Sequence, residues 1–223
     1  MVGVNQEAIL FRESASALFG GRTHSVSSGV EPGEFRRLAH RANFRAKSTI
    51  FAENEPSVAA YMLTHGTGRL YKMLGDGRRQ IVGFALPGDF LGLPISNRYS
   101  CSLDAISQVA TCKFLTEPFL AFLKANPKSL YSMLQASLHE TNVAREHMLL
   151  LGRGTAEEKV TEFIISWRER VGRGDVLSNL VPLPMSRNDI ADFLGLTIET
   201  VSRVLAKLER EDVVRLVPPK DCN

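Results

Sequence analysis

The chain has 223 residues, of which 44% are hydrophobic and 23% charged, and its formal net charge is +3. This length supports a substantial core in one large or two small domains, and the composition is typical of a soluble globular protein. No segment approaches the roughly 18 to 20 apolar residues of a membrane-spanning helix, and residues 1–21 lack the pattern of a secretory signal. We therefore expect a cytoplasmic protein with no membrane partner.

Neither the charge distribution nor the cysteines identify a site by themselves. Residues 151–223 carry eleven Lys/Arg and twelve Asp/Glu, so nucleic-acid binding depends on where individual charges point. Cys101, Cys112 and Cys222 are odd in number and lack CxxC spacing, which argues against a disulfide framework or a zinc site. We expect the cysteines to pack as small hydrophobic residues. Cys222, beside the C-terminus, is expected to be exposed and is the candidate for redox control.

Residues 1–30 run into a stretch rich in Gly and Ser, which predicts an N-terminal arm or linker. A short helix is expected around residues 32–42. Between residues 44 and 115, short apolar runs alternate with turn residues, and the Asp-Gly pair within residues 75–79 is a strong hairpin signal. Several strands at near-regular spacing predict a β-roll over residues 31–126. The runs expected to form strands are VAAYML, GRLYKML, QIVGFAL, LDAISQV and TCKFL.

After Thr116 the pattern becomes helical. Residues 118–125 form a short predicted helix, and residues 127–151 form a long one of roughly 37 Å that begins at a proline. Apolar side chains recur along the long helix, which predicts either a face packed on its own domain or a contact with a second copy of the chain. Because this helix joins two domains, we expect a dimerisation helix. Its predicted contact residues are Leu130, Leu134, Leu138, Thr141 and Met148.

Residues 152–223 are expected to form a DNA-binding domain. It contains the segment MSRNDIADFLGLTIETVSRVLAKLER, which has the pattern of two short amphipathic helices. Ser186, followed three residues later by Asp189, predicts the start of the first helix, and Gly195 tolerates the positive φ of a tight turn. Thr197 is placed to cap the second helix. The steric pattern that predicts a helix-turn-helix is the spacing of Ala191, Gly195 and Val201.

The second helix of this motif leaves a polar face free of its apolar stripe. Arg203 can donate two hydrogen bonds to guanine, Glu199 can accept one from cytosine, and Ser202 can contact a base or a phosphate. These three residues are the predicted base readers. The alternative is an ordinary exposed helix face with an i,i+4 ion pair between Glu199 and Arg203. The residues predicted to contact the DNA backbone are Thr197, Thr200, Lys207, Ser186 and Arg187.

With both halves in view, the chain resembles the Crp/Fnr superfamily of bacterial transcription regulators. GRLYKMLGDGRRQIVGFALPGDFLGL looks like the β-roll of that family, residues 127–151 look like its dimer helix, and residues 186–210 look like its DNA-binding motif. TIETVSR has the E-x-x-S-R pattern of the Fnr/FixK branch. The segment LPMSRNDIADFLGLTIETVSR is most similar to FixK, a branch that regulates microaerobic and nitrogen-fixation genes.

The resemblance implies an α+β fold, with an N-terminal β-roll like the cyclic-nucleotide-binding jelly roll, a long dimerisation helix and a C-terminal winged helix-turn-helix. It also implies that Glu199, Ser202 and Arg203 read a TTGA-type half-site. A homodimer would then bind an inverted repeat in double-stranded DNA. Contact with RNA polymerase would make the protein an activator.

Three features depart from the family pattern. Residues 1–100 contain no cysteine, so the iron–sulfur cluster of Fnr cannot be assembled in the same way. Gly92 is followed by Leu93, and Tyr99 stands where the family's cyclic-nucleotide binders have an arginine, which counts against binding of cyclic AMP. The wing has one predicted strand, DVVRLV, before PPKDCN ends the chain.

No enzyme motif is present in the sequence. The histidines are scattered, and there is no nucleophile elbow, P-loop or dinucleotide fingerprint. We expect no catalysis, no metal and no bound cofactor, with control through protein abundance or oxidation of Cys222. Two alternatives remain. One is an effector-gated regulator whose β-roll binds a small molecule, and the other is an effector-binding module in which the helix-turn-helix is only scaffold.

Overall fold

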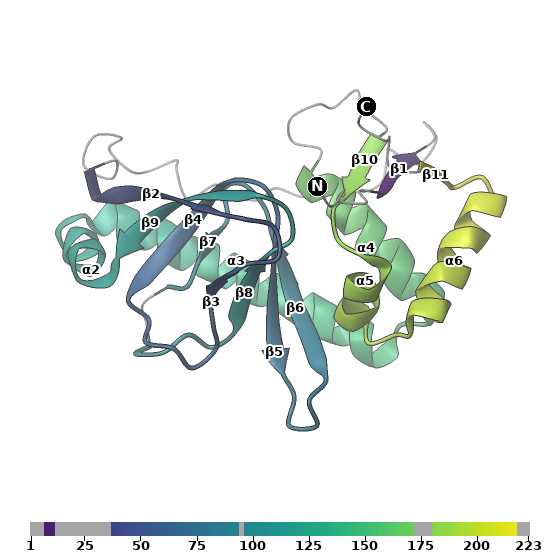
Figure 1. Ribbon diagram of the computed structural model, residues 1–223, viewed down its shortest axis with the longest axis horizontal. Helices are drawn as coiled ribbons and strands as arrows, with labels where there is room; N and C mark the ends of the chain where they lie inside the picture. Colours follow the sequence, from purple (N-terminus) through teal and green to yellow (C-terminus); the bar gives the residue numbers. More distant parts are fainter. Residues whose placement is uncertain (1–6, 12–36, 94–95, 172–179, 218–223) are drawn as a thin grey trace. The chain divides into compact units, whose positions relative to one another are not determined.

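The computed structural model describes residues 7–11, 37–93, 96–171 and 180–217 of the chain. The chain divides into two compact units, one made of Thr23–Arg145 and the other of Met1–Arg22 with Glu146–Asn223 (Figure 1). The boundary falls inside one long helix. The sequence pattern had predicted residues 127–151 as a separate segment between the two domains. Antiparallel sheets and helices occur in both units, which confirms the predicted α+β class.

The unit from Thr23 to Arg145 contains a β-roll of two four-stranded antiparallel sheets. Its strands are β2 (Ala39–Phe44), β3 (Thr49–Phe51), β4 (Ala59–His65), β5 (Gly68–Met73), β6 (Arg79–Ala85), β7 (Phe90–Leu91), β8 (Ser102–Ala105) and β9 (Val109–Leu115). One sheet has the strand order β2-β9-β4-β7 and the other β3-β8-β5-β6 (Figure 1). Apolar side chains such as Leu63, Leu103 and Val109 are fully buried between them.

Local turn chemistry fixes the β5–β6 hairpin where the Asp-Gly signal predicted it. The N–H of Leu74 donates to the carbonyl of Arg78 at 2.8 Å, and the N–H of Gly77 donates to the carbonyl of Leu74 at 2.9 Å. Asp76 accepts hydrogen bonds from the backbone and the side chain of Arg78, and the backbone bond is the largest cause of a lowered pKa at Asp76. The hairpin prediction is therefore confirmed.

Two secondary-structure predictions in this unit are wrong in part. Of the helix predicted around residues 32–42, residues 39–42 belong to β2, because the backbone there pairs with β9, as in Ala42 with Thr111. The strand predicted for LDAISQV is interrupted after Ala105. The N–H groups of Ile106 and Ser107 both donate to the carbonyl of Thr67, which turns the chain before β9 begins.

Two helices follow the β-roll, α2 (Thr116–Ala125) and α3 (Pro127–Arg153). In α2, Phe119 and Phe122 are buried, and the ring of Phe119 stacks on Phe90 with centroids 5.3 Å apart. Met133, on the second turn of α3, joins the same cluster. Among the described side chains of α3, those that are buried against this core lie at the beginning of the helix.

The other unit combines three helices with a three-stranded sheet (Figure 1). The helices are α4 (Ala156–Val171), α5 (Arg187–Leu194) and α6 (Ile198–Arg210). The strands are β1 (Glu7–Phe11), β10 (Leu180–Leu183) and β11 (Val214–Val217). Buried Trp167 joins helix to sheet, since its indole N–H donates to the carbonyl of Pro182 at 2.9 Å.

Strand β1 lies in the middle of this sheet and corrects the prediction for the N-terminal residues. Its residues pair antiparallel with β10 on one side and with β11 on the other. EAILF is a short apolar run that was assigned to the arm or linker over residues 1–30, because its pairing partners lie at the opposite end of the chain. The wing therefore has more than the single predicted strand, although DVVRLV does supply β11.

The described residues hold no helix that is long and apolar enough to cross a bilayer. Cys101 and Cys112 are partly buried in the β-roll unit, and burial raises the pKa of the Cys101 thiol. Cys222, the candidate for redox control, lies outside the described residues.

Candidate nucleic-acid interface

The helix-turn-helix forms from local capping interactions that the sequence already carries. The hydroxyl of Ser186 accepts a hydrogen bond from the Asp189 N–H at 3.1 Å, and the Asp189 carboxylate accepts from the Ser186 N–H at 3.1 Å. This reciprocal capping box starts α5. Gly195 ends the helix with φ of 61° and ψ of 39°, a left-handed conformation that a side chain at Cβ would strain. The predicted start and end of the first helix are confirmed.

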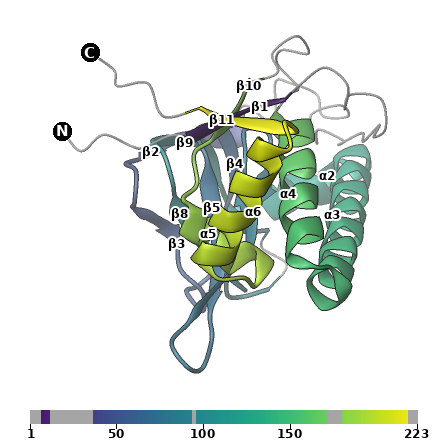
Figure 2. The same cartoon turned by 90° about the vertical axis from the view of Figure 1, so that its right-hand side faces the viewer.

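Helix α6 begins at its cap and packs through one stripe. The Thr197 hydroxyl accepts from the N–H of Thr200 at 3.2 Å, which fixes the first turn. Ala191 of α5 is only 2% exposed, so the two helices approach closely at this small side chain. Figure 2 shows α5, α6 and α4 together in this unit. The buried stripe of α6 is the predicted one: Val201, Val204, Leu205 and Leu208.

An ion pair ties α6 to α4. The Lys207 ammonium lies 2.6 Å from a carboxylate oxygen of Glu157 and 3.7 Å from one of Glu211. The hydrogen bond to Glu157 is the main reason that the pKa of Lys207 is raised. Lys207 was predicted to contact a phosphate. In the free protein its charge is already partnered, and Glu157 is a residue that spacing within the motif gave no reason to select.

The predicted base readers lie together on the outer face of α6. Glu199 and Arg203 are exposed, whereas Ser202 is half-buried. A guanidinium nitrogen of Arg187 lies 3.4 Å from the Ser202 hydroxyl, so the N-terminal turn of α5 reaches the same face. Arg187 and Ser186 stand at the start of α5, where the predicted backbone contacts are placed.

The two opposite charges on α6 are not paired with each other. Among the described residues no ion pair joins Glu199 to Arg203, although they stand four residues apart. Arg203 instead donates to the hydroxyl of Thr200 at 3.4 Å. The Glu199 pKa is held below its usual value by its own backbone N–H and then by a hydrogen bond from the Thr197 side chain. A carboxylate acceptor and a guanidinium donor therefore remain open to solvent on one helix face.

A second feature of this unit is a stacked histidine. The ring of His147, near the end of α3, lies 4.1 Å from the ring of Phe193 in α5 at an angle of 17°. Its Nε2 is buried with no hydrogen-bond partner among the described residues. Burial lowers the pKa of His147 against the opposing effect of a hydrogen bond to the Phe193 backbone, and Lys159 lowers it further. The scattered spacing of the histidines in the sequence gave no reason to select this one.

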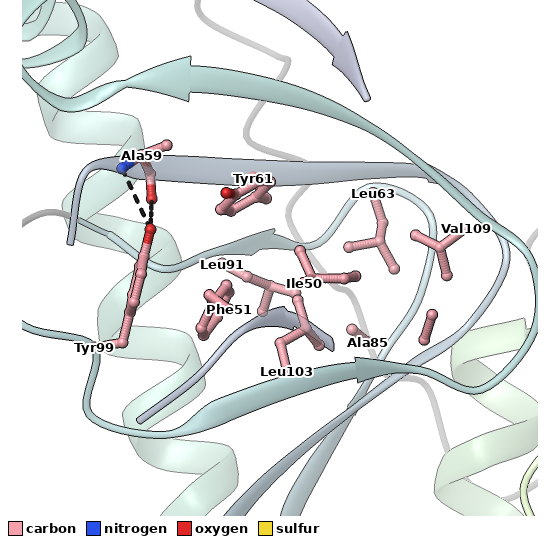
Figure 3. Close-up of a cluster of buried hydrophobic side chains, with 11 residues drawn as sticks. Ile50, Phe51, Ala59, Tyr61, Leu63, Ala85, Leu91, Tyr99, Leu103 and Val109 are labelled. Atoms are coloured by element: carbon pink, nitrogen blue, oxygen red, sulfur yellow. Dashed lines mark hydrogen bonds between the residues drawn. The ribbon is translucent and has the colours of Figure 1, made fainter. Parts of the chain in front are cut away.

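In the β-roll, Tyr99 fills the position where the family's cyclic-nucleotide binders have an arginine. Its ring stacks on Phe51 with centroids 4.2 Å apart, and its hydroxyl donates to the Ala59 carbonyl at 2.7 Å (Figure 3). Gly92 has φ of +67°, and a Cβ there would come within 2.9 Å of the Tyr99 ring. Arg98 is exposed and donates to the carbonyl of Asn54. Tyr99 carries no charge and Arg98 lies on the surface, so neither of them offers an inward-facing cation for a phosphate.

No cluster of three or more His, Cys, Asp or Glu side chains suited to a metal ion occurs among the described residues. The aromatic packing around Tyr99 extends to Tyr61, whose pKa is raised to about 12 by burial and then by the neighbouring Tyr99. Figure 3 shows this cluster inside the roll, with the Tyr99 hydroxyl directed at Ala59. Sequence spacing located Tyr99 but did not predict that its ring would occupy the interior.

A β-roll, a long helix and a capped helix-turn-helix with a small sheet define a bacterial transcription regulator of the Crp/Fnr class. Residues 183–214 match the family model for bacterial regulatory proteins of the crp family, and residues 41–126 match the cyclic nucleotide-binding domain.

Individual proteins with similar sequences or structures belong to the same class of transcription regulator. The chain is 52% identical over 185 residues to the transcriptional activatory protein AadR of Rhodopseudomonas palustris, covering 83% of this chain and 77% of that protein. It is 47% identical over 199 residues to the nitrogen fixation regulation protein FixK of Bradyrhizobium diazoefficiens, covering 88% and 84%. The solved structure of FixK2 from Bradyrhizobium japonicum aligns with a TM-score of 0.74 at 33% identity, covering 82% of this chain and 93% of that one.

The chain therefore belongs to the Crp/Fnr family, near its FixK branch. It is a transcriptional activator of that type and not an enzyme. Regulators of this family bind DNA and typically act as dimers.

Proposed function

We propose that the protein binds a TTGA-type inverted repeat in double-stranded DNA as a homodimer and activates transcription there. The observation that carries this proposal is the outer face of α6. Glu199 and Arg203 are exposed, unpaired with each other and held on a helix whose opposite stripe is buried. Arg203 would donate to guanine O6 and N7, and Glu199 would accept from a cytosine amine. The half-buried Ser202 stands between them as a third base reader.

Helix α3 supports the homodimer. A helix packed only on its own unit would bury an apolar stripe along its whole length. In α3 the predicted contact residues are instead exposed in the single chain, and Thr141 bonds only within the helix, to the carbonyl of Ser137. A second copy of the same face would cover them. Their exposed fractions are 50% for Leu130, 55% for Leu134, 57% for Leu138 and 63% for Met148.

The interior of the β-roll supports binding without a small effector. Tyr99 stacks on Phe51 and bonds to the Ala59 backbone, so the protein's own side chain takes the place that a ligand's phosphate needs. Moving it out would leave the backbone groups of Ala59 without this partner and would expose an aromatic ring. The ligand-free protein is therefore expected to bind DNA.

The genes under control are proposed from the relatives. The names of AadR and FixK describe an activator and a regulator of nitrogen fixation, which favours microaerobic or nitrogen-fixation genes as targets. Activation requires contact with RNA polymerase, and the proposed DNA partner implies a cytoplasmic location in a bacterium.

In vitro selection of bound DNA by the purified, metal-free protein tests the proposal. The expected product is a two-fold symmetric TTGA-type repeat whose half-sites are about 34 Å apart, centre to centre. Selection of no consensus would refute sequence-specific binding, and a consensus without two-fold symmetry would refute the homodimer. A consensus that emerges only after addition of a small molecule would favour the effector-gated alternative.

A further inference from the structure

Two threonine hydroxyls form a short hydrogen-bonded series with Arg203 at the start of α6. The Arg203 guanidinium lies 3.4 Å from the Thr200 hydroxyl oxygen, and that oxygen lies 3.1 Å from the Thr197 hydroxyl oxygen. Among the described residues the Glu199 carboxylate makes no ion pair with Arg203. Thr197, Glu199 and Arg203 are exposed and Thr200 is half-buried at the start of the helix.

The direction of the contact with Arg203 follows from its chemistry. The guanidinium has only donors, so the Thr200 hydroxyl accepts from it. The Thr197 hydroxyl accepts from the Thr200 N–H, and either hydroxyl can supply the proton of the contact between the two side chains. Thr197 therefore holds Thr200 in place beside Arg203.

This arrangement has a consequence for DNA reading. A Glu and an Arg four residues apart on a helix usually attract each other. A direct pair would orient both heads toward each other and would have to break before either could bind a base. The neutral Thr200 hydroxyl orients the Arg203 guanidinium without cancelling its charge. It also restricts the rotamers of Arg203 before DNA arrives, which lowers the entropy cost of a two-point contact.

We propose that Thr200, held by Thr197, is a positioning residue that keeps Arg203 from pairing with Glu199 and aims it at the base edges. This inference rests on the proposed function, because it assigns a role within the same base-reading face. It differs from the simple prediction that both threonines contact the DNA backbone. A phosphate contact affects all sequences alike, whereas a positioning contact affects discrimination between base pairs.

The test uses Thr200→Val, which keeps the β-branched shape and removes the hydroxyl, and Thr200→Ser, which keeps the hydroxyl. Dissociation constants of the full chain are measured at one salt concentration for the selected repeat, for repeats with single base-pair changes and for random duplex. We expect Thr200→Val to reduce discrimination at the base pair read by Arg203 by about 3- to 10-fold. Thr200→Ser should retain wild-type discrimination. The same valine change in an Arg203→Ala background should add no further loss, because the group that is positioned is gone.

Other outcomes are decisive. An equal loss on every duplex would show a backbone contact and overturn the inference. An unchanged Thr200→Val, or a Thr200→Ser as impaired as the valine, would also overturn it. A wild-type protein that binds all duplexes equally would refute the proposed function itself, and this inference with it. Thermal melting of each variant checks that the fold of the motif is retained.

Discussion

Tyr99→Phe removes one oxygen atom from the interior of the β-roll and tests whether the protein's own side chain holds the ligand position closed. The Tyr99 side chain is 6% exposed, and its hydroxyl both donates to the Ala59 carbonyl at 2.7 Å and accepts from the Ala59 N–H at 3.3 Å. The phenylalanine ring retains the stacking on Phe51. The variant therefore isolates the two hydrogen bonds from the packing.

The magnitude follows from what remains buried after the change. Both polar groups of Ala59 lose this partner in a region that water does not reach, which costs about 1–2 kcal/mol in the free energy of unfolding. For a unit of this size that corresponds to roughly 4–8 °C in its melting transition. Tyr71→Phe is the matched control, since Tyr71 is half-buried and its hydroxyl makes no hydrogen bond among the described residues.

Calorimetry measures the melting transition, and fluorescence anisotropy with the selected repeat measures DNA affinity. We expect Tyr99→Phe to melt lower than wild type, Tyr71→Phe to melt within about 1 °C of it, and all three to bind DNA alike with or without cyclic AMP. If Tyr99→Phe melted no lower than the control, the hydroxyl would not be holding the interior. If cyclic AMP raised the DNA affinity of the wild type, the idea of a self-filled roll would be wrong.

Other expected outcomes concern the helices. Leu138→Asp should convert the dimer to a monomer in sedimentation experiments and abolish binding to the inverted repeat, whereas Val82→Asp, at an exposed position of the β-roll, should leave the dimer intact. Lys207→Gln should lower the slope of log affinity against log salt by about 0.9 per subunit if Lys207 leaves Glu157 for a phosphate, and an unchanged slope would confine it to the α4–α6 contact. His147 has a lowered pKa, so the unfolded chain, with a value near 6.5, binds more protons. Stability should therefore be complete above about pH 6.5 and fall as pH drops from there to the lowered value, and His147→Gln should remove that dependence in urea titrations at about pH 5.5 and about pH 7.5.

The helix-turn-helix was predictable because its determinants are local. Ser186 and Asp189 satisfy each other's backbone within one turn, and Gly195 meets the backbone demand of the turn without help from distant residues. Each signal can be read from a few neighbouring letters of the sequence. The same holds for the Asp-Gly hairpin between β5 and β6.

Features that depend on distant partners were not predictable in this way. Ile106 has a strand-like sequence context, but hydrogen bonds to Thr67 turn the chain there. The alternative of a Glu199–Arg203 pair was reasonable from spacing, and the contact of Arg203 with the Thr200 hydroxyl became evident only from side-chain positions. The partner of Lys207 lies on another helix, 50 residues earlier in the chain.

The central position of β1 makes one sheet depend on segments that are translated far apart. Residues 7–11 leave the ribosome long before both of their neighbours in the sheet, β10 and β11. At bacterial elongation rates the early strand waits on the order of 10 s for its partners. Until then the backbone N–H and C=O groups of β1 can hydrogen-bond only with water or with other chains. A fragment that begins after α3 would lack β1, so β10 and β11 would each expose an unpaired strand edge.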